Sequence, residues 1–231
     1  MLPEPNASAL ASFSVEPALF EKYLDYVKRL CMSEDKKIEH FMQYVSLDAW
    51  GLQAEYIRNG LNFDLLWDRV NQFLTEVPNY SSLTFIVTMN NLSVTTLGSL
   101  FAGILGLRKT YSKTYQRVWF DTPVLRDPAW QSLQILPESY ADQLETIWTW
   151  MLKNVETEAD PFHGFKDYEL SRLDRDIAWM RQGQQHDHSQ VKADFYRFFN
   201  EHDRRRGTNF LKTFPEMTEF YQQCEYYART I

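Results

Sequence analysis

The chain has 231 residues, which is enough for one large domain or a domain and a half. Hydrophobic residues make up 44% of it, the usual share for a packed protein, so we do not expect a disordered chain. The net charge of −7 argues against a general nucleic-acid surface, which needs a basic stripe facing the phosphates.

No apolar stretch approaches the length of a membrane span, and the first residues lack a signal pattern. We therefore expect a soluble cytoplasmic protein with neither membrane nor nucleic-acid partners. Cys31 and Cys224 lie far apart in sequence, so we predict no disulfide framework and expect both thiols to be buried. His186 and His188 are two residues apart and have no third ligand nearby, so we predict no metal site.

In residues 1–15 the apolar residues show no regular spacing, so we predict a loose N-terminal lead-in without regular structure. Beyond them, helical and strand-like apolar segments alternate. We predict helices over 17–31, 66–77 and 97–105, and strands over 41–48, 83–89 and 116–121. A helix in each gap between strands is typical of βαβ units and a parallel sheet, and three such units do not close a barrel.

The pattern becomes helical throughout after Pro137. Apolar stripes predict helices over 140–155, 170–180, 191–199 and 217–224. We therefore predict an α/β protein with three parts: a lead-in over 1–15, a parallel α/β region over 16–137, and an all-helical C-terminal region over 138–231.

Polar residues follow each predicted strand. The first strand ends in Ser46 and Asp48, the second runs into Asn90 and Asn91, and the third ends in Asp121. Because ligands of parallel α/β sheets bind beyond the carboxyl ends of the strands, these side chains are candidates for one binding rim. The alternative is that Asp48 caps the following turn and that the two asparagines cap the next helix.

Arg58 is a further candidate, because the turn signal at Asn59 and Gly60 places its guanidinium near the same rim. Arginine pairs bidentately with carboxylate ligands. The alternative is a salt bridge to a nearby surface acid such as Glu55. Recognised hydrolase and nucleotide-binding motifs are absent from the sequence.

Several of these segments resemble the twitch-domain-containing radical SAM proteins. Residues 44–51 (YVSLDAWG) followed by 53–60 (QAEYIRNG) are similar to the middle of the radical SAM barrel. The similarity continues in residues 88–93 (TMNNLS), 115–121 (YQRVWFD), 134–137 (QILP) and 198–215, and runs from about residue 13 to about residue 224.

The resemblance implies a partial (β/α) barrel that binds S-adenosylmethionine beside a 4Fe-4S cluster and cleaves it to a radical. It further implies that Ser46, Asp48 and Arg58 contact the methionine or ribose part of the cofactor. Asn90, Asn91 and Asp121 would then be rim residues near cofactor or substrate. The substrate is not indicated.

The chain departs from this family in its cysteines. The family holds its cluster with a CxxxCxxC motif after the first barrel strand, and this sequence has no such motif. We therefore expect the C-terminal portion of a radical SAM enzyme, inactive alone and active when joined to or associated with an upstream cluster-binding polypeptide. The alternative is a cluster-free binding or interaction module on a degenerate barrel. An open sheet edge would make the isolated chain oligomeric or poorly soluble.

Overall fold

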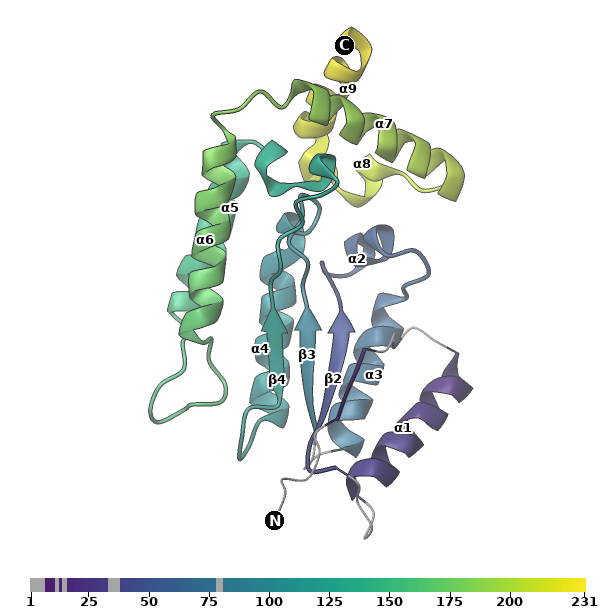
Figure 1. The fold of residues 1–231 in the computed structure, drawn as a ribbon, viewed down its shortest axis with the longest axis vertical. Helices are drawn as coiled ribbons and strands as arrows, with labels where there is room; N and C mark the ends of the chain where they lie inside the picture. The colour runs from purple at the N-terminus through teal and green to yellow at the C-terminus, as the bar shows by residue number, and fades with distance from the viewer. Residues whose placement is uncertain (1–6, 11–12, 14–15, 33–37, 78–80) are drawn as a thin grey trace.

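The computed structural model describes residues 7–10, 13, 16–32, 38–77 and 81–231. Its centre is a parallel sheet of four strands in the order β1-β2-β3-β4 (Figure 1). The strands are β1 (Ala7–Leu10), β2 (Phe41–Ser46), β3 (Ser81–Ile86) and β4 (Val118–Asp121). The predicted parallel α/β architecture is thus confirmed.

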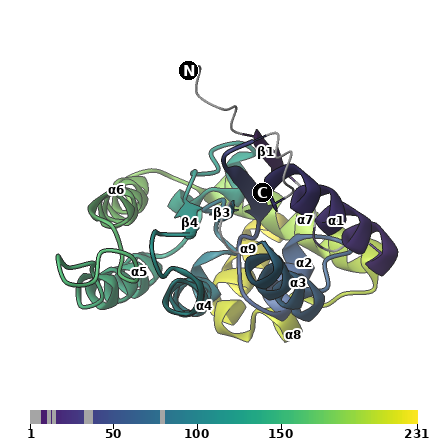
Figure 2. The same cartoon turned by 90° about the horizontal axis from the view of Figure 1, so that it is seen from below.

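Helices connect successive strands. They are α1 (Pro17–Met32), α2 (Leu52–Ile57), α3 (Phe63–Glu76) and α4 (Leu97–Tyr111), with a short 3-10 turn, η1 (Val94–Thr96), before α4. Figure 2 shows α4, α3 and α1 arranged in an arc along one side of the sheet. Because strand order follows chain order, every crossover returns on the same side, and the sheet is singly wound.

Alternate side chains of the strands pack on these helices. Phe41 contacts Phe73 of α3 at a ring-centroid distance of 6.4 Å, and Phe120 contacts Phe101 of α4 at 4.7 Å. Side chains point alternately to the two faces of a strand. The residues between them therefore face away from α3 and α4, and on the three strands with described side chains they are Met42, Tyr44, Ser46, Ser82, Thr84, Ile86, Trp119 and Asp121.

The C-terminal region is helical, as predicted. It comprises η2 (Ala129–Gln131), η3 (Leu133–Ile135), α5 (Glu138–Leu152), α6 (Asp167–Gly183), α7 (Ser189–Arg206), α8 (Phe210–Thr213), η4 (Pro215–Met217) and α9 (Thr218–Thr230). The pair α5 and α6 stands beside β4 and α4, whereas α7, α8 and α9 lie beyond the carboxyl ends of the strands (Figure 1). Two hydrogen bonds from Gln53 of α2, to Thr213 O and Glu216 Oε1, join the two regions.

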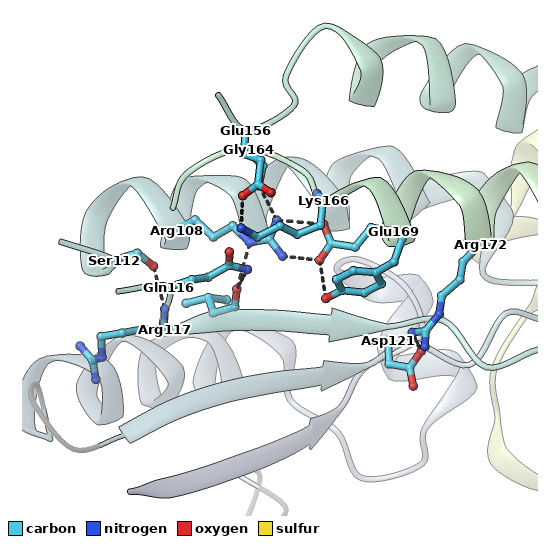
Figure 3. A network of polar contacts seen from close by, with 12 residues as sticks. Arg108, Ser112, Gln116, Arg117, Asp121, Glu156, Gly164, Lys166, Glu169 and Arg172 are labelled. Atoms are coloured by element: carbon cyan, nitrogen blue, oxygen red, sulfur yellow. Dashed lines mark hydrogen bonds and ion pairs between the residues drawn. The ribbon is translucent and has the colours of Figure 1, made fainter. Parts of the chain in front are cut away.

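A buried ion pair attaches α6 to the sheet region (Figure 3). Arg108 of α4 and Glu169 of α6 are both fully buried, and Arg108 Nη2 lies 2.5 Å from Glu169 Oε1. Arg108 also donates to the carbonyls of Val118 and Gly164. These polar contacts help to hold α6 beside β4.

The structure adds a strand where the sequence predicts a loose lead-in. β1 pairs in parallel with β2, with Ala7 opposite Phe41 and Leu10 opposite Tyr44. Four residues, two of them alanine, are too few to show an apolar period, so this strand is defined by its pairing with β2. The remaining lead-in residues, 1–6, 11–12 and 14–15, lie outside the described part of the chain. Across the parts of the chain that are described, no helix is long and apolar enough to span a membrane.

Candidate functional site at the carboxyl ends of the strands

Asp48 ties the ends of two strands together. It follows β2, is 5% exposed, and accepts a hydrogen bond at Oδ1 from the backbone N–H of Thr88 at 2.8 Å. Its Oδ2 lies 2.8 Å from Nη2 of Arg58. A carboxylate this deeply buried needs such partners, because an unpaired buried charge is costly. The two predicted site residues Asp48 and Arg58 are thus brought into direct contact.

Arg58 directly follows α2, and its side chain is 35% exposed. Its acidic partner is Asp48 and not Glu55, the example raised from the sequence; Glu55 Oε1 accepts from the backbone N–H of Phe63 at 2.8 Å. The Nε of Arg58 is buried and has no hydrogen-bond partner among the described residues. Arg58 therefore holds Asp48 with one part of its guanidinium and keeps further donor capacity.

Ser46 and Asp121 share the sheet face that points away from α3 and α4. Ser46 is the last residue of β2 and stands opposite Ile86 of β3, which in turn stands opposite Asp121 of β4. Asp121 forms an ion pair with Arg172 of α6, and both side chains are partly exposed (Figure 3). The two candidates therefore lie on the same face of the sheet, with strand β3 between them.

The two asparagines build the loop after β3. Asn90 accepts from the N–H of Leu92 and donates to the carbonyl of Thr88, both at 2.9 Å. These bonds form a turn within the loop and do not cap the next helix, since the N-cap residues of η1 and α4 are Ser93 and Thr96. Asn91 is fully buried and donates to the carbonyl of Trp130 at 2.8 Å, while its Oδ1 has no partner among the described residues. The Asn90 side chain therefore stabilises the loop after β3, and the Asn91 side chain holds η2 against that loop.

Sequence reasoning did not select Arg172, which pairs with Asp121 from a helix 51 residues further along the chain. No local motif marks it, because its role depends on α6 being held beside β4. Asp176, one turn further along α6, was not selected from the sequence either. It is 1% exposed, and its Oδ2 has no hydrogen-bond partner among the described residues.

Burial raises the pKa of Asp176 from 3.8 to about 6, and Arg175 and Arg172 oppose this shift. The folded state therefore binds more protons than the unfolded state between about pH 4 and pH 6, and the free energy of unfolding falls as pH rises through that window. We expect Asp176→Asn to stabilise the protein by up to about 3 kcal/mol at pH 8, since each pKa unit corresponds to about 1.4 kcal/mol.

The gain from Asp176→Asn should fall below about 1 kcal/mol near pH 4, where the wild-type carboxyl is protonated in the folded state and about half protonated in the unfolded state. Urea unfolding at pH 4, 6 and 8 measures this difference. Asp194→Asn on exposed surface of α7 is the control and should show no such pH-dependent gain. A variant that is less stable than wild type at pH 8 would contradict this reading of Asp176.

The two cysteines do not suit a cluster. Cys31 of α1 and Cys224 of α9 are both fully buried, and burial raises the pKa of their thiols to about 11 and about 12. Cluster ligation needs thiolates, which this environment disfavours. No group of three or more histidine, cysteine, aspartate or glutamate side chains suited to a metal occurs within the described ranges.

Comparison with protein-family models, with curated proteins and with solved structures finds no match for this chain. A functional assignment therefore rests on the fold, on the rim residues and on the sequence resemblance.

Proposed function

We propose that this chain is the C-terminal portion of a radical SAM enzyme, and that its strand ends bind S-adenosylmethionine. The observation that carries the proposal is the Asp48–Arg58 pair at the carboxyl end of a singly wound parallel sheet. In this view the four strands are the later units of a partial (β/α) barrel, and the protein works in the cytoplasm.

The fold supports the proposal because it places the candidate residues at one end of the sheet. In parallel barrels, strand ends carry the site and the outer helices hold it rigid. The crossovers here lie along one side of the sheet, as in a barrel segment, and leave the opposite face to Ser46, Asp121 and their neighbours.

Arg58 is the residue best suited to the carboxylate of the methionine moiety. Its partly exposed guanidinium has donor capacity beyond its contact with Asp48, and paired donors to a carboxylate give strong, oriented hydrogen bonds. Asp48 would hold Arg58 in place. Ser46 and Asp121 would offer a hydroxyl and a carboxylate to the ribose hydroxyls, while Asn90 and Asn91 keep the adjoining loop in position.

When bound beside a reduced cluster, S-adenosylmethionine supplies a carbon radical. The residues of this chain would orient the cofactor and limit its access to water. The cluster itself does not fit Cys31 and Cys224, so we propose that an upstream radical SAM or twitch polypeptide, in the same chain or a separate one, provides the ligands.

The internal pairing of the rim favours a second candidate, the cluster-free binding or interaction module. Asp48 is paired with Arg58, and Asp121 with Arg172, so the rim charges balance each other without a ligand. A module that has lost its chemistry would be stable in this form. Binding of an adenosyl ligand distinguishes the two, because only the first candidate requires it.

We expect the isolated chain to bind S-adenosylhomocysteine, and Arg58→Gln to weaken this binding about tenfold, since a hydrogen bond to a charged group contributes about 1.5–3 kcal/mol. Isothermal titration calorimetry measures the affinity. Arg58→Lys should bind with intermediate affinity, because it keeps the charge and loses the paired donors.

The control for Arg58→Gln is Arg181→Gln. Arg181 is similarly exposed and pairs with Asp142 and Glu145 on α5. This variant should bind like wild type. If Arg58→Gln and wild type bind S-adenosylhomocysteine equally well, or if the folded wild-type chain shows no saturable binding, Asp48 and Arg58 do not form a cofactor site. Either result would favour the cluster-free module.

A further inference from the structure

A pocket of about 300 Å³ lies at the same end of the sheet as the rim and is separate from the Asp48–Arg58 pair. Parallel pairing continues past β3 and β4 through a bridge between Met89 and Val124, and the N–H of Leu125 donates to the carbonyl of Met89 at 2.9 Å. The next residue, Arg126, enters the pocket, whose other walls are η2, η3, α6 and the start of α7. Its lining residues are Arg126, Ala129, Ser132, Gln134, Ile135, Trp179, His188 and Val191.

Close packing fixes the wall that α6 supplies. A Cβ on Gly183 would meet Gln134 Cβ at 2.5 Å, so α6 and η3 are in direct contact at that point. Gln134 Nε2 donates to the carbonyl of Trp179 at 3.1 Å. Nε2 of His188 lies 2.9 Å from the carbonyl of Gly183, which identifies Nε2 as the protonated nitrogen and leaves Nδ1 free of this contact. The backbone of α6 at Trp179 and the imidazole of His188 are therefore held in place.

The charge of the pocket is positive in an acidic protein. None of its lining residues is an aspartate or a glutamate. The guanidinium of Arg126 lies 5.8 Å from the centre of the Trp179 ring, and it has no hydrogen bond or ion pair among the residues that the structure describes. Asp127 and Asp187 neighbour Arg126 and His188 in sequence but do not line the pocket, so Arg126 is the charged group that an anion would meet there.

We propose that this pocket binds a small organic carboxylate with an apolar or aromatic body. Arg126 would pair with the carboxylate, and the body would lie against Trp179, Val191 and Ile135. One guanidinium balances one negative charge, which favours a monoanionic carboxylate over a phosphate dianion. Binding of the anion does not depend on the proposed function.

Phenylacetate is the probe, and the indole N–H signal of Trp179, assigned with Trp179→Phe, is the readout in a ¹H–¹⁵N correlation spectrum. We expect a saturable shift of this signal with phenylacetate. The neutral isostere phenylacetamide should bind about tenfold more weakly, and inorganic phosphate should also bind more weakly. Arg126→Gln should weaken phenylacetate binding about tenfold, whereas Arg181→Gln, on the same helix as Trp179, should not.

Equal binding of phenylacetate and phenylacetamide to the wild-type chain would overturn the proposal, whatever the stability of the variants. So would no shift of the Trp179 signal, or unchanged affinity in folded Arg126→Gln. Tighter binding of phosphate that depends on Arg126 would overturn the assignment to carboxylates. Because no adenosyl ligand is used, a negative result here does not bear on the proposed cofactor site at Asp48 and Arg58. A negative result with S-adenosylhomocysteine likewise does not bear on this pocket.

Discussion

Replacing Glu169 with glutamine is expected to lower the free energy of unfolding by about 3–5 kcal/mol, because it leaves the buried charge of Arg108 without its counter-ion. Both side chains are fully buried. The two carboxylate oxygens accept from Arg108 at 2.5 and 3.0 Å, and Oε2 also accepts from the N–H of Lys166 at 3.0 Å. Glutamine has nearly the same shape, but its NH₂ group replaces one carboxylate oxygen and would face N–H donors of Arg108 or Lys166.

Urea unfolding of wild type and Glu169→Gln measures this loss. The matched control is Arg181→Gln, which removes a surface ion pair between α5 and α6 and should cost less than about 1 kcal/mol. The double variant Arg108→Met with Glu169→Leu should be more stable than Glu169→Gln alone, because no unpaired charge remains. A loss below about 1 kcal/mol for Glu169→Gln would show that α6 is held mainly by apolar packing.

Asp203→Asn is expected to destabilise the protein by about 2–3 kcal/mol, because Asp203 joins α7 to both α2 and α8. Its Oδ1 accepts from the hydroxyls of Tyr56 at 2.8 Å and Thr208 at 2.6 Å. Its Oδ2 accepts from the N–H of Phe210 at 2.6 Å. An amide can accept at one end only, so its NH₂ group would face one of these three donors.

The same unfolding experiment tests Asp203→Asn, with Asp194→Asn as the control. Asp194 lies on the same helix and pairs with Arg197 on the exposed surface, so this substitution should cost no more than about 0.5 kcal/mol. Tyr56→Phe removes one of the three bonds and should cost about 1 kcal/mol. If Asp194→Asn and Asp203→Asn cost the same, Asp203 does not act as the proposed link between the two regions.

The alternation of strands and helices could be predicted because it depends on the spacing of apolar residues along short segments of the chain. The strands over Phe41–Ser46, Ser81–Ile86 and Val118–Asp121 overlap the predicted ranges 41–48, 83–89 and 116–121, although some of their ends differ by two or three residues. Glycines in the helix over Leu97–Tyr111 also indicate close packing, and one of them requires it: a Cβ on Gly103 would lie 2.4 Å from the Trp50 ring. Gly106 has open space around it, so the same signal is not informative at every position.

The candidate site could be predicted only as a set of strand ends. Parallel topology alone places Ser46, Asp48 and Asp121 at one end of the sheet. Arg172, the partner of Asp121, could not be predicted, because the two residues are 51 apart in sequence and meet through tertiary packing. The same is true of the Arg108–Glu169 pair, whose members are 61 residues apart. β1 was missed for the same reason, since its strand is defined by contact with β2.

The most direct test of cofactor binding at the strand ends is to map which backbone amide signals of the ¹⁵N-labelled chain S-adenosylhomocysteine shifts. The proposed function predicts saturable shifts concentrated at residues 46–48, 58, 88–91 and 121, and in Arg58→Gln these shifts should require about tenfold more ligand to saturate. Saturable shifts confined to other residues, or no shift at these positions in the folded wild-type chain, would contradict it.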